Sequence, residues 1–297
     1  MTAISPAIGL VAGLALALLF RQSDKKGAVK AGKFLLQIAV VLLGFQLQIA
    51  TVFKVGRSSI PLTAVTISAV LLFGFLLGRL FRLDQKLSTL ISSGTAICGG
   101  SAIAAIAPAI QASATQIAVS MGIVFILNAV ALLIFPPLGK MLHMSQQQFG
   151  LWAAIAIHDT SSVVGATVSY GQEAAAIGTT VKLTRALWIL PLAFVMARMH
   201  KSAGKARLPY FLAGFVAASL LASYLPAWHE LWAWLALTGK HLMIGILFLV
   251  GLGLTIEDLQ TVGFRPLLAA IGLWLFIGIG SLILILYFDA ASFLSAF

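Results

Sequence analysis

Long apolar stretches separated by short polar connections dominate the chain. A helix needs about 20 predominantly apolar residues to cross a membrane. Stretches of this kind cover residues 4–20, 33–53, 60–80, 87–110, 114–138, 149–170, 173–197, 209–226, 231–252 and 265–288. The pattern predicts an all-α polytopic membrane protein with about ten transmembrane helices. Because Arg21 and Lys25 follow the first stretch, we expect a retained span there rather than a cleaved signal peptide.

Composition agrees with this class and narrows the function. Hydrophobic residues make up 61% of the chain and charged residues only 9%, whereas soluble domains carry about 25% charged residues. The net charge of +11 is spread over short loops, so it does not predict nucleic-acid binding. The lone Cys98 excludes an intrachain disulfide. No metal-ligand spacing, nucleotide motif or nucleophile–base pair is evident, so we expect no cofactor and no enzymatic activity.

The distribution of Lys and Arg predicts the orientation. With the N-terminus outside, most loop cations fall in inner loops, whereas Lys54 and Arg57 fall in an outer loop. The inner loops comprise residues 21–33, 79–86, 140, 198–207 and 265. Inner loops are the ones enriched in Lys and Arg, so this orientation is the expected one.

Two stretches resemble each other within the chain. LLGFQLQIATVFKVG (residues 42–56) aligns without a gap with LVGLGLTIEDLQTVG (residues 249–263). The two spans involved have opposite parity, so the repeat is inverted, as in many transporters. Chance similarity between helices rich in Leu and Gly is the alternative. We expect one membrane domain with a broken-helix core at about 87–197, flanked by repeat-related spans at about 4–80 and 209–290.

Two of the apolar stretches are interrupted by small and polar residues. The first contains Gly94, Thr95, Gly99, Gly100, Ser101 and Pro108. The second contains His158, Asp159, Thr160, Ser161, Ser162 and Gly165. A broken helix at membrane depth survives only where protein or a watery cavity satisfies its backbone. The half-helix after a break offers free N–H groups and a partial positive charge, which favour an anion. Close helix packing through small residues is the alternative interpretation.

Three cations fall inside predicted spans. Lys182 and Arg185 stand three residues apart, on one face of a helix, and Lys182 lies about 13 Å into its span. Lys240 lies beside His241, at a similar depth in a later span. A charge at the bilayer centre costs at least about 2.5 kcal/mol, so such residues usually face a cavity, a partner or a substrate. The alternatives are snorkelling to the interface and a structural ion pair with Asp159.

Several strings resemble one known family. They are LLGFQL, SSGTAICGGSAIAA, HDTSSVVGA and VKLTRALWILP, together with the late GLGL. In this order they resemble the bacterial sulfate exporter family of inner-membrane transporters, over about residues 4–290. That family is distantly similar to the cation/proton antiporter and bile-acid transporter folds. The resemblance implies a multi-pass inner-membrane protein, an elevator-type mechanism and a homodimer.

These observations lead to one main hypothesis and two alternatives. The main hypothesis is a secondary transporter, by resemblance an exporter, of a small inorganic or organosulfur anion such as sulfate, sulfite or a sulfonate. Both breaks would bind the anion, the three intramembrane cations would neutralise it, and Asp159 or His158 would carry a coupled proton. A cation/proton antiporter with Asp159 as ion ligand is the first alternative. A membrane-embedded enzyme or an anion channel is the second.

Overall fold

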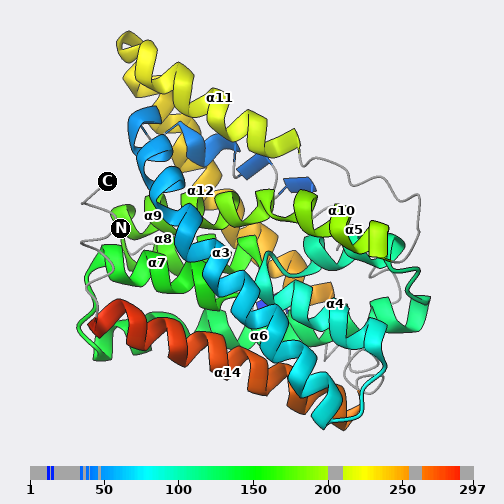
Figure 1. Cartoon of the computed structure of the whole chain (residues 1–297). Coiled ribbons are helices and arrows are strands. Elements are labelled where there is room, and N and C mark those ends of the chain that lie inside the picture. Colours follow the sequence, from blue (N-terminus) through cyan, green and yellow to red (C-terminus); the bar gives the residue numbers. More distant parts are fainter. Residues whose placement is uncertain are drawn as a thin grey trace.

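The computed structural model describes residues 12–13, 15–16, 34–35, 38–39, 41–45, 48–199, 210–253 and 263–287. Every regular element in these ranges is a helix, which confirms the predicted all-α class (Figure 1). The elements are α3 (Ile49–Leu80), α4 (Gln85–Ala96), α5 (Gly100–Ala109), α6 (Ala114–Met141), α7 (Gln146–Ala156), α8 (Thr160–Tyr170), α9 (Gln172–Leu187), α10 (Ile189–Met199), α11 (Tyr210–Tyr224), η1 (Pro226–Trp228), α12 (His229–Gly253) and α14 (Phe264–Tyr287).

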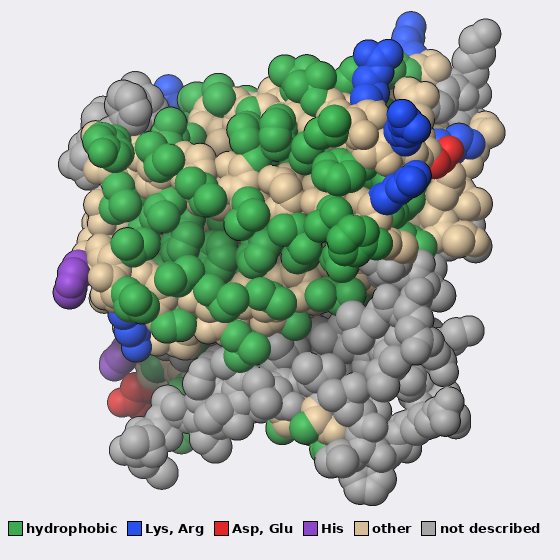
Figure 2. All heavy atoms as spheres, turned by 90° about the horizontal axis from the view of Figure 1, so that it is seen from below, with side chains coloured by type: hydrophobic (Ala, Val, Ile, Leu, Met, Phe, Trp, Pro, Cys, Tyr) green, Lys and Arg blue, Asp and Glu red, His purple; other side chains and the backbone are tan. Residues whose placement is uncertain are grey.

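The surface is that of a protein surrounded by lipid. Four helical stretches in the described ranges are long and apolar enough to cross a membrane: Val52–Leu80, Thr115–Met141, Gln172–Met199 and Phe264–Tyr287. Their outer faces carry large exposed apolar side chains, such as Leu72 on α3 and Ile279 on α14. Figure 2 shows a broad apolar band, with Lys and Arg side chains gathered beyond one end of it. Apolar exposure on this scale is unfavourable in water, so the chain is a polytopic membrane protein.

The first interrupted stretch folds back on itself. α4 and α5 form a hairpin whose open ends lie side by side. Lys86 Nζ donates to the carbonyl of Gln111 over 2.8 Å, and Gln116 Nε2 donates to Asp84 Oδ1 over 2.7 Å. A continuous helix of this length would hold these residues more than about 30 Å apart. The chain therefore enters and leaves at the same end of the molecule.

The second interrupted stretch does the same from the other end. The amide N–H of Glu173, after α8, donates to Gln146 Oε1, at the start of α7, over 3.0 Å. The rings of Phe149 and Tyr170 stack with their centroids 3.8 Å apart. The long helix α6 separates the two hairpins along the chain, and they lie toward opposite ends of the molecule (Figure 1).

Both predicted interruptions are thus present, but each one makes a re-entrant hairpin instead of a crossing. The arms contain 10 to 12 residues, or about 15–18 Å, which is roughly half of a 30 Å hydrocarbon core. The number of crossings expected from sequence therefore falls by two. In the predicted orientation Lys140 moves from the inner to the outer side, whereas residues 79–86 and Arg198 stay on the inner side.

One predicted outer loop is helical. α3 begins at Ile49 and runs through Lys54 and Arg57, which were expected to separate two spans. The hydroxyls of Ser58 and Ser59 donate to the helix carbonyls three residues before them, so these serines do not break the helix. Most of the predicted span 4–20, some residues of the span 33–53 and much of the later copy of the repeat lie outside the described residues.

Candidate functional site at the hairpin tips

The two hairpin tips meet inside the molecule. We call residues 97–99 tip 1 and residues 157–159 tip 2. Gly99 has φ +64° and ψ −126°, a conformation that essentially only glycine adopts. A Cβ atom on Gly99 would lie 3.5 Å from Cα and Cβ of Asp159 and 3.0 Å from Val124 Cγ1. Glycine is therefore favoured by the backbone conformation of the turn and by the tight space beside Val124, and the two tips lie within van der Waals distance of each other.

Three side chains satisfy the carbonyls that α7 leaves unpaired at its carboxyl end. These carbonyls belong to Ala154, Ile155, Ala156 and Ile157. Arg185 Nη1 donates to the first over 3.0 Å and to the second over 2.7 Å. Trp274 Nε1 donates to the third over 3.0 Å. Lys182 Nζ donates to the fourth over 2.7 Å and lies 3.4 Å from the first. Every backbone acceptor at this buried helix end thus has a donor.

Arg185 also reaches the other hairpin. Its Nη2 donates to the carbonyl of Ala96, the last residue of α4. Arg185 and Lys182 are both 0% exposed. Carboxyl-terminal helix ends carry partial negative charge. The two cations therefore neutralise the partial charges at the ends of α4 and α7, where each hairpin turns. The hydrogen bonds run to backbone carbonyls, so neither snorkelling nor an ion pair with Asp159 accounts for these residues.

Asp159 caps the helix that follows tip 2. Its carboxylate accepts from the backbone N–H of Ser161 over 3.0 Å and also from the Ser161 hydroxyl. Its own backbone N–H donates to Asn128 Oδ1 on α6 over 3.0 Å. Asn128 is the only asparagine in the sequence and stands in an apolar span, a position for which we expected a hydrogen bond between helices rather than a place in the substrate site. This hydrogen bond is present, and it links α6 to tip 2.

The helix that follows tip 1 starts differently. No side chain caps the amino end of α5. Gly100 is half-buried beside Phe125 and Met121, whose nearest atoms would lie 3.8 and 3.9 Å from a Cβ at that position. Ser101 is exposed. Among the described residues, the first N–H groups of α5 therefore have no capping side chain, whereas α8 has one in Asp159.

The remaining candidates divide into buried and undescribed side chains. The hydroxyl residues Thr95, Thr160, Ser161 and Ser162 are all buried around the tips. Lys240 lies in α12, which packs against α8, but its side chain is outside the described part. The structure therefore brings together every described candidate from both interruptions, with Ser101 as the exposed one.

Comparison with known sequences identifies the family. The family described as conserved hypothetical protein 698 matches residues 2–270. A UPF0324 membrane protein of Geobacter sulfurreducens is 46% identical over 274 residues, which is 92% of this chain and 88% of the relative. One of Bdellovibrio bacteriovorus is 43% identical over 279 residues, 92% and 86% of the two chains. The chain belongs to this family of bacterial membrane proteins. No solved structure matches it.

In this family member, several buried polar atoms near the tips have no protein partner. Both ring nitrogens of His158 are unpaired, as are Asn128 Nδ2, Arg185 Nε and Ser93 Oγ. Buried polar groups are normally satisfied by protein or by water, and among the described residues no protein atom satisfies these. Among the described residues, no group of three or more His, Cys, Asp or Glu side chains is placed to bind a metal ion.

Proposed function

We propose that this chain is a secondary transporter that carries a small oxyanion, such as sulfate, sulfite or a sulfonate, past the hairpin tips. The proposal rests on two hairpins that enter from opposite ends and meet in front of the fully buried Lys182 and Arg185. Helices interrupted near the membrane midplane form the substrate sites of many transporters. The resemblance to the sulfate exporter family supports the same chemistry.

The charge balance at the tips favours an anion. Each helix end contributes about half a unit charge. The two cations and the two amino-terminal helix ends outweigh the carboxylate of Asp159 and the two carboxyl-terminal ends. An excess of about one positive charge remains. A cation at the same place would be repelled.

The residues then take different roles. Lys182 and Arg185 hold the tips and supply the positive field, because their nitrogens are already bonded to carbonyls. The direct ligands are the free N–H groups at the start of α5 and the hydroxyl of Ser101. Asp159 or His158 carries a coupled proton, and among the described residues the ring nitrogens of His158 have no hydrogen-bond partner. Asp159 fixes tip 2 by capping α8.

The opposed hairpins also suit alternating access. The open end of the α4–α5 hairpin lies at the inner side of the membrane. The open end of the α7–α8 hairpin lies at the outer side. Movement at tip 1 opens the site inward, and movement at tip 2 opens it outward. We propose elevator-type transport by a homodimer, with no cofactor and no enzymatic step.

Substitution at Ser101 tests the site. The purified protein is mixed with sulfate, sulfite, methanesulfonate or sodium, and its thermal stability is measured. A ligand that binds only the folded state raises that stability. Ser101→Asp places a carboxylate in the first turn of α5, where it interacts favourably with the helix dipole, yet it repels an anion. We expect the stabilisation by oxyanions to disappear in S101D and to persist in the neutral control S101N.

The outcome also separates the alternatives. Stabilisation by sodium without any anion effect would contradict the proposal and favour a cation/proton antiporter. The half-buried carboxylate of Asp159 is the observation that keeps this second candidate in view. Asp159→Asn would then abolish cation exchange in proteoliposomes. In an anion carrier D159N changes the pH dependence of flux or the stability, but flux persists.

A further inference from the structure

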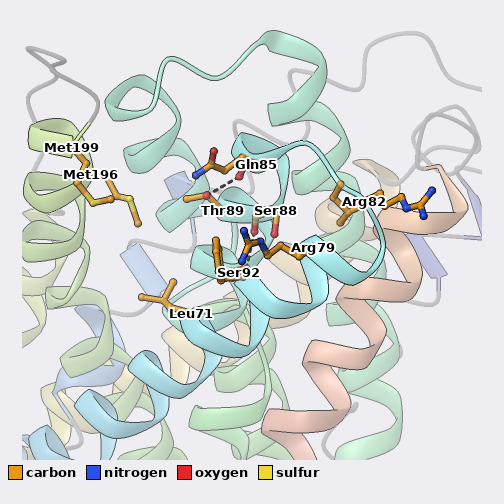
Figure 3. A pocket seen from close by; sticks show the side chains of 12 residues that line it. Leu71, Arg79, Arg82, Gln85, Ser88, Thr89, Ser92, Met196 and Met199 are labelled. Atoms are coloured by element: carbon orange, nitrogen blue, oxygen red, sulfur yellow. Dashed lines mark hydrogen bonds between the residues drawn. The ribbon is translucent and has the colours of Figure 1, made fainter.

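A pocket lies away from the tips, at the inner end of the molecule. It has a volume of about 530 Å³ and is enclosed by the end of α3, the start of α4 and the end of α10 (Figure 3). This volume is in the range typical of ligand sites. Its lining residues are Leu71, Phe75, Gly78, Arg79, Arg82, Leu83, Gln85, Ser88, Thr89, Ser92, Met196 and Met199.

The pocket changes from apolar to cationic along the membrane normal. On α3, Leu71 and Phe75 lie deeper and Arg79 lies nearer the inner surface. Arg79 follows Leu71 by eight positions, which correspond to about 12 Å of helix. Met196 and Met199 on α10 form the opposite wall. The deep part of the pocket is apolar and its opening at the inner surface is cationic. A phospholipid has the same order of groups, with its acyl chains deep in the membrane and its phosphate at the surface.

Arg79 is the cation available at this rim. Its guanidinium lies 5.1 Å from the centre of the Phe75 ring, and among the described residues it has no hydrogen-bond or ion-pair partner. In Figure 3 the Arg79 side chain lies over the hydroxyl-bearing face of α4, whereas Arg82 points away from the other labelled side chains. A guanidinium in this position can bind a phosphate through two parallel hydrogen bonds.

The hydroxyls on the α4 wall are already engaged. Ser88 Oγ donates to the carbonyl of Gly74 over 3.1 Å, and Ser92 Oγ donates to the carbonyl of Ser88 over 2.7 Å. Thr89 Oγ1 donates to the carbonyl of Gln85 over 2.8 Å. Their protons are therefore used within the protein and do not form a series of donors leading a free anion toward tip 1.

We propose that this pocket binds an anionic phospholipid of the inner leaflet, with its phosphate on Arg79 and an acyl chain along Leu71, Phe75 and the two methionines. Basic pockets between transmembrane helices on the cytoplasmic side are suited to phospholipid head groups. The site is independent of the anion site at the tips. It lies at the inner ends of α3 and α4, and the hydroxyls of Ser88 and Ser92 face α3 rather than tip 1.

Delipidated protein in a neutral detergent tests the proposal. Phosphatidylglycerol, phosphatidylcholine or inorganic phosphate is added, and bound lipid is counted by native mass spectrometry alongside the melting temperature. We expect phosphatidylglycerol to bind and stabilise the protein, and phosphatidylcholine to do so much less. Arg79→Gln should weaken phosphatidylglycerol binding about tenfold, as expected for a lost charge-assisted hydrogen bond.

Two control variants make the result specific. Arg79→Lys keeps the charge and should retain part of the preference for phosphatidylglycerol. Arg57→Gln removes an exposed arginine at the other end of the same helix and should leave lipid binding unchanged. Equal binding of the two lipids, or unchanged binding in R79Q, would overturn the proposal. Stabilisation by inorganic phosphate alone would overturn it too, in favour of a free-anion vestibule.

Discussion

Arg185 is the residue on which both hairpins depend, since it donates to carbonyls at the ends of α4 and α7. Arg185→Met should lower the free energy of unfolding by about 1–3 kcal/mol for each carbonyl left without a donor. The free energy of unfolding of Arg185→Lys should lie between those of R185M and the parent, because an ammonium group lacks the planar guanidinium that donates to several acceptors at once. Thermal unfolding in detergent measures both, with the exposed Arg57→Met as control. R185M as stable as the parent would contradict the assignment.

Two neighbouring glycines offer a matched comparison at the same tip. Gly99→Ala should destabilise the protein by about 1–3 kcal/mol, because its positive φ excludes a side chain and the new methyl group presses on Val124. Gly100→Ala should be neutral or slightly stabilising, since this position is helical and has no atom within 3.8 Å of the new Cβ. The melting temperatures of the two variants, measured under the same conditions, test whether G99A loses more stability than G100A. Equal losses would mean that crowding at the tip, not backbone conformation, sets the requirement.

Sequence reasoning selected the residues at the tips but not their partners. Asp159, Lys182 and Arg185 stand out because a charge is costly in an apolar span, and Gly99 stands out because it forms part of an interruption. The structure brings these residues together. That the cations bond to helix carbonyls could not be predicted, because the acceptors are backbone groups with no signature in the sequence. Trp274 was missed for a related reason, since an aromatic residue in a span usually packs against lipid or core.

Among the elements, the hairpins were the hardest to predict. A run of about 24 apolar and small residues fits one interrupted crossing as well as two short antiparallel arms, and hydrophobicity alone does not separate them. Contacts between residues distant in sequence, such as Lys86 with Gln111, determine that the stretch forms two antiparallel arms. By contrast, the bounds of α6, α11, α12 and α14 lie within a few residues of the predicted ones, because these helices follow a simple apolar run between polar ends.

For the whole molecule, the hairpins fix which side of the membrane each loop occupies. Single cysteines are introduced at Gln85, Thr115, Met141 and Gln172, all exposed in the structure, after replacing Cys98 with serine. An impermeant thiol reagent should label positions 141 and 172 in intact spheroplasts and positions 85 and 115 only in inverted vesicles. Two full crossings would instead place 85 and 115, and likewise 141 and 172, on opposite sides.

Synthesis proceeds from the N-terminus, so both hairpins leave the ribosome before α9 does. Until residues 182 and 185 emerge, carbonyls at both tips have no donors, and lipid cannot supply any. The arms of 10 to 12 residues are also too short to insert as spans of their own. The hairpins must therefore remain at the membrane surface or inside the translocation channel until α9 is made. In this protein a helix that comes later in the chain sets when the earlier segments can enter the bilayer.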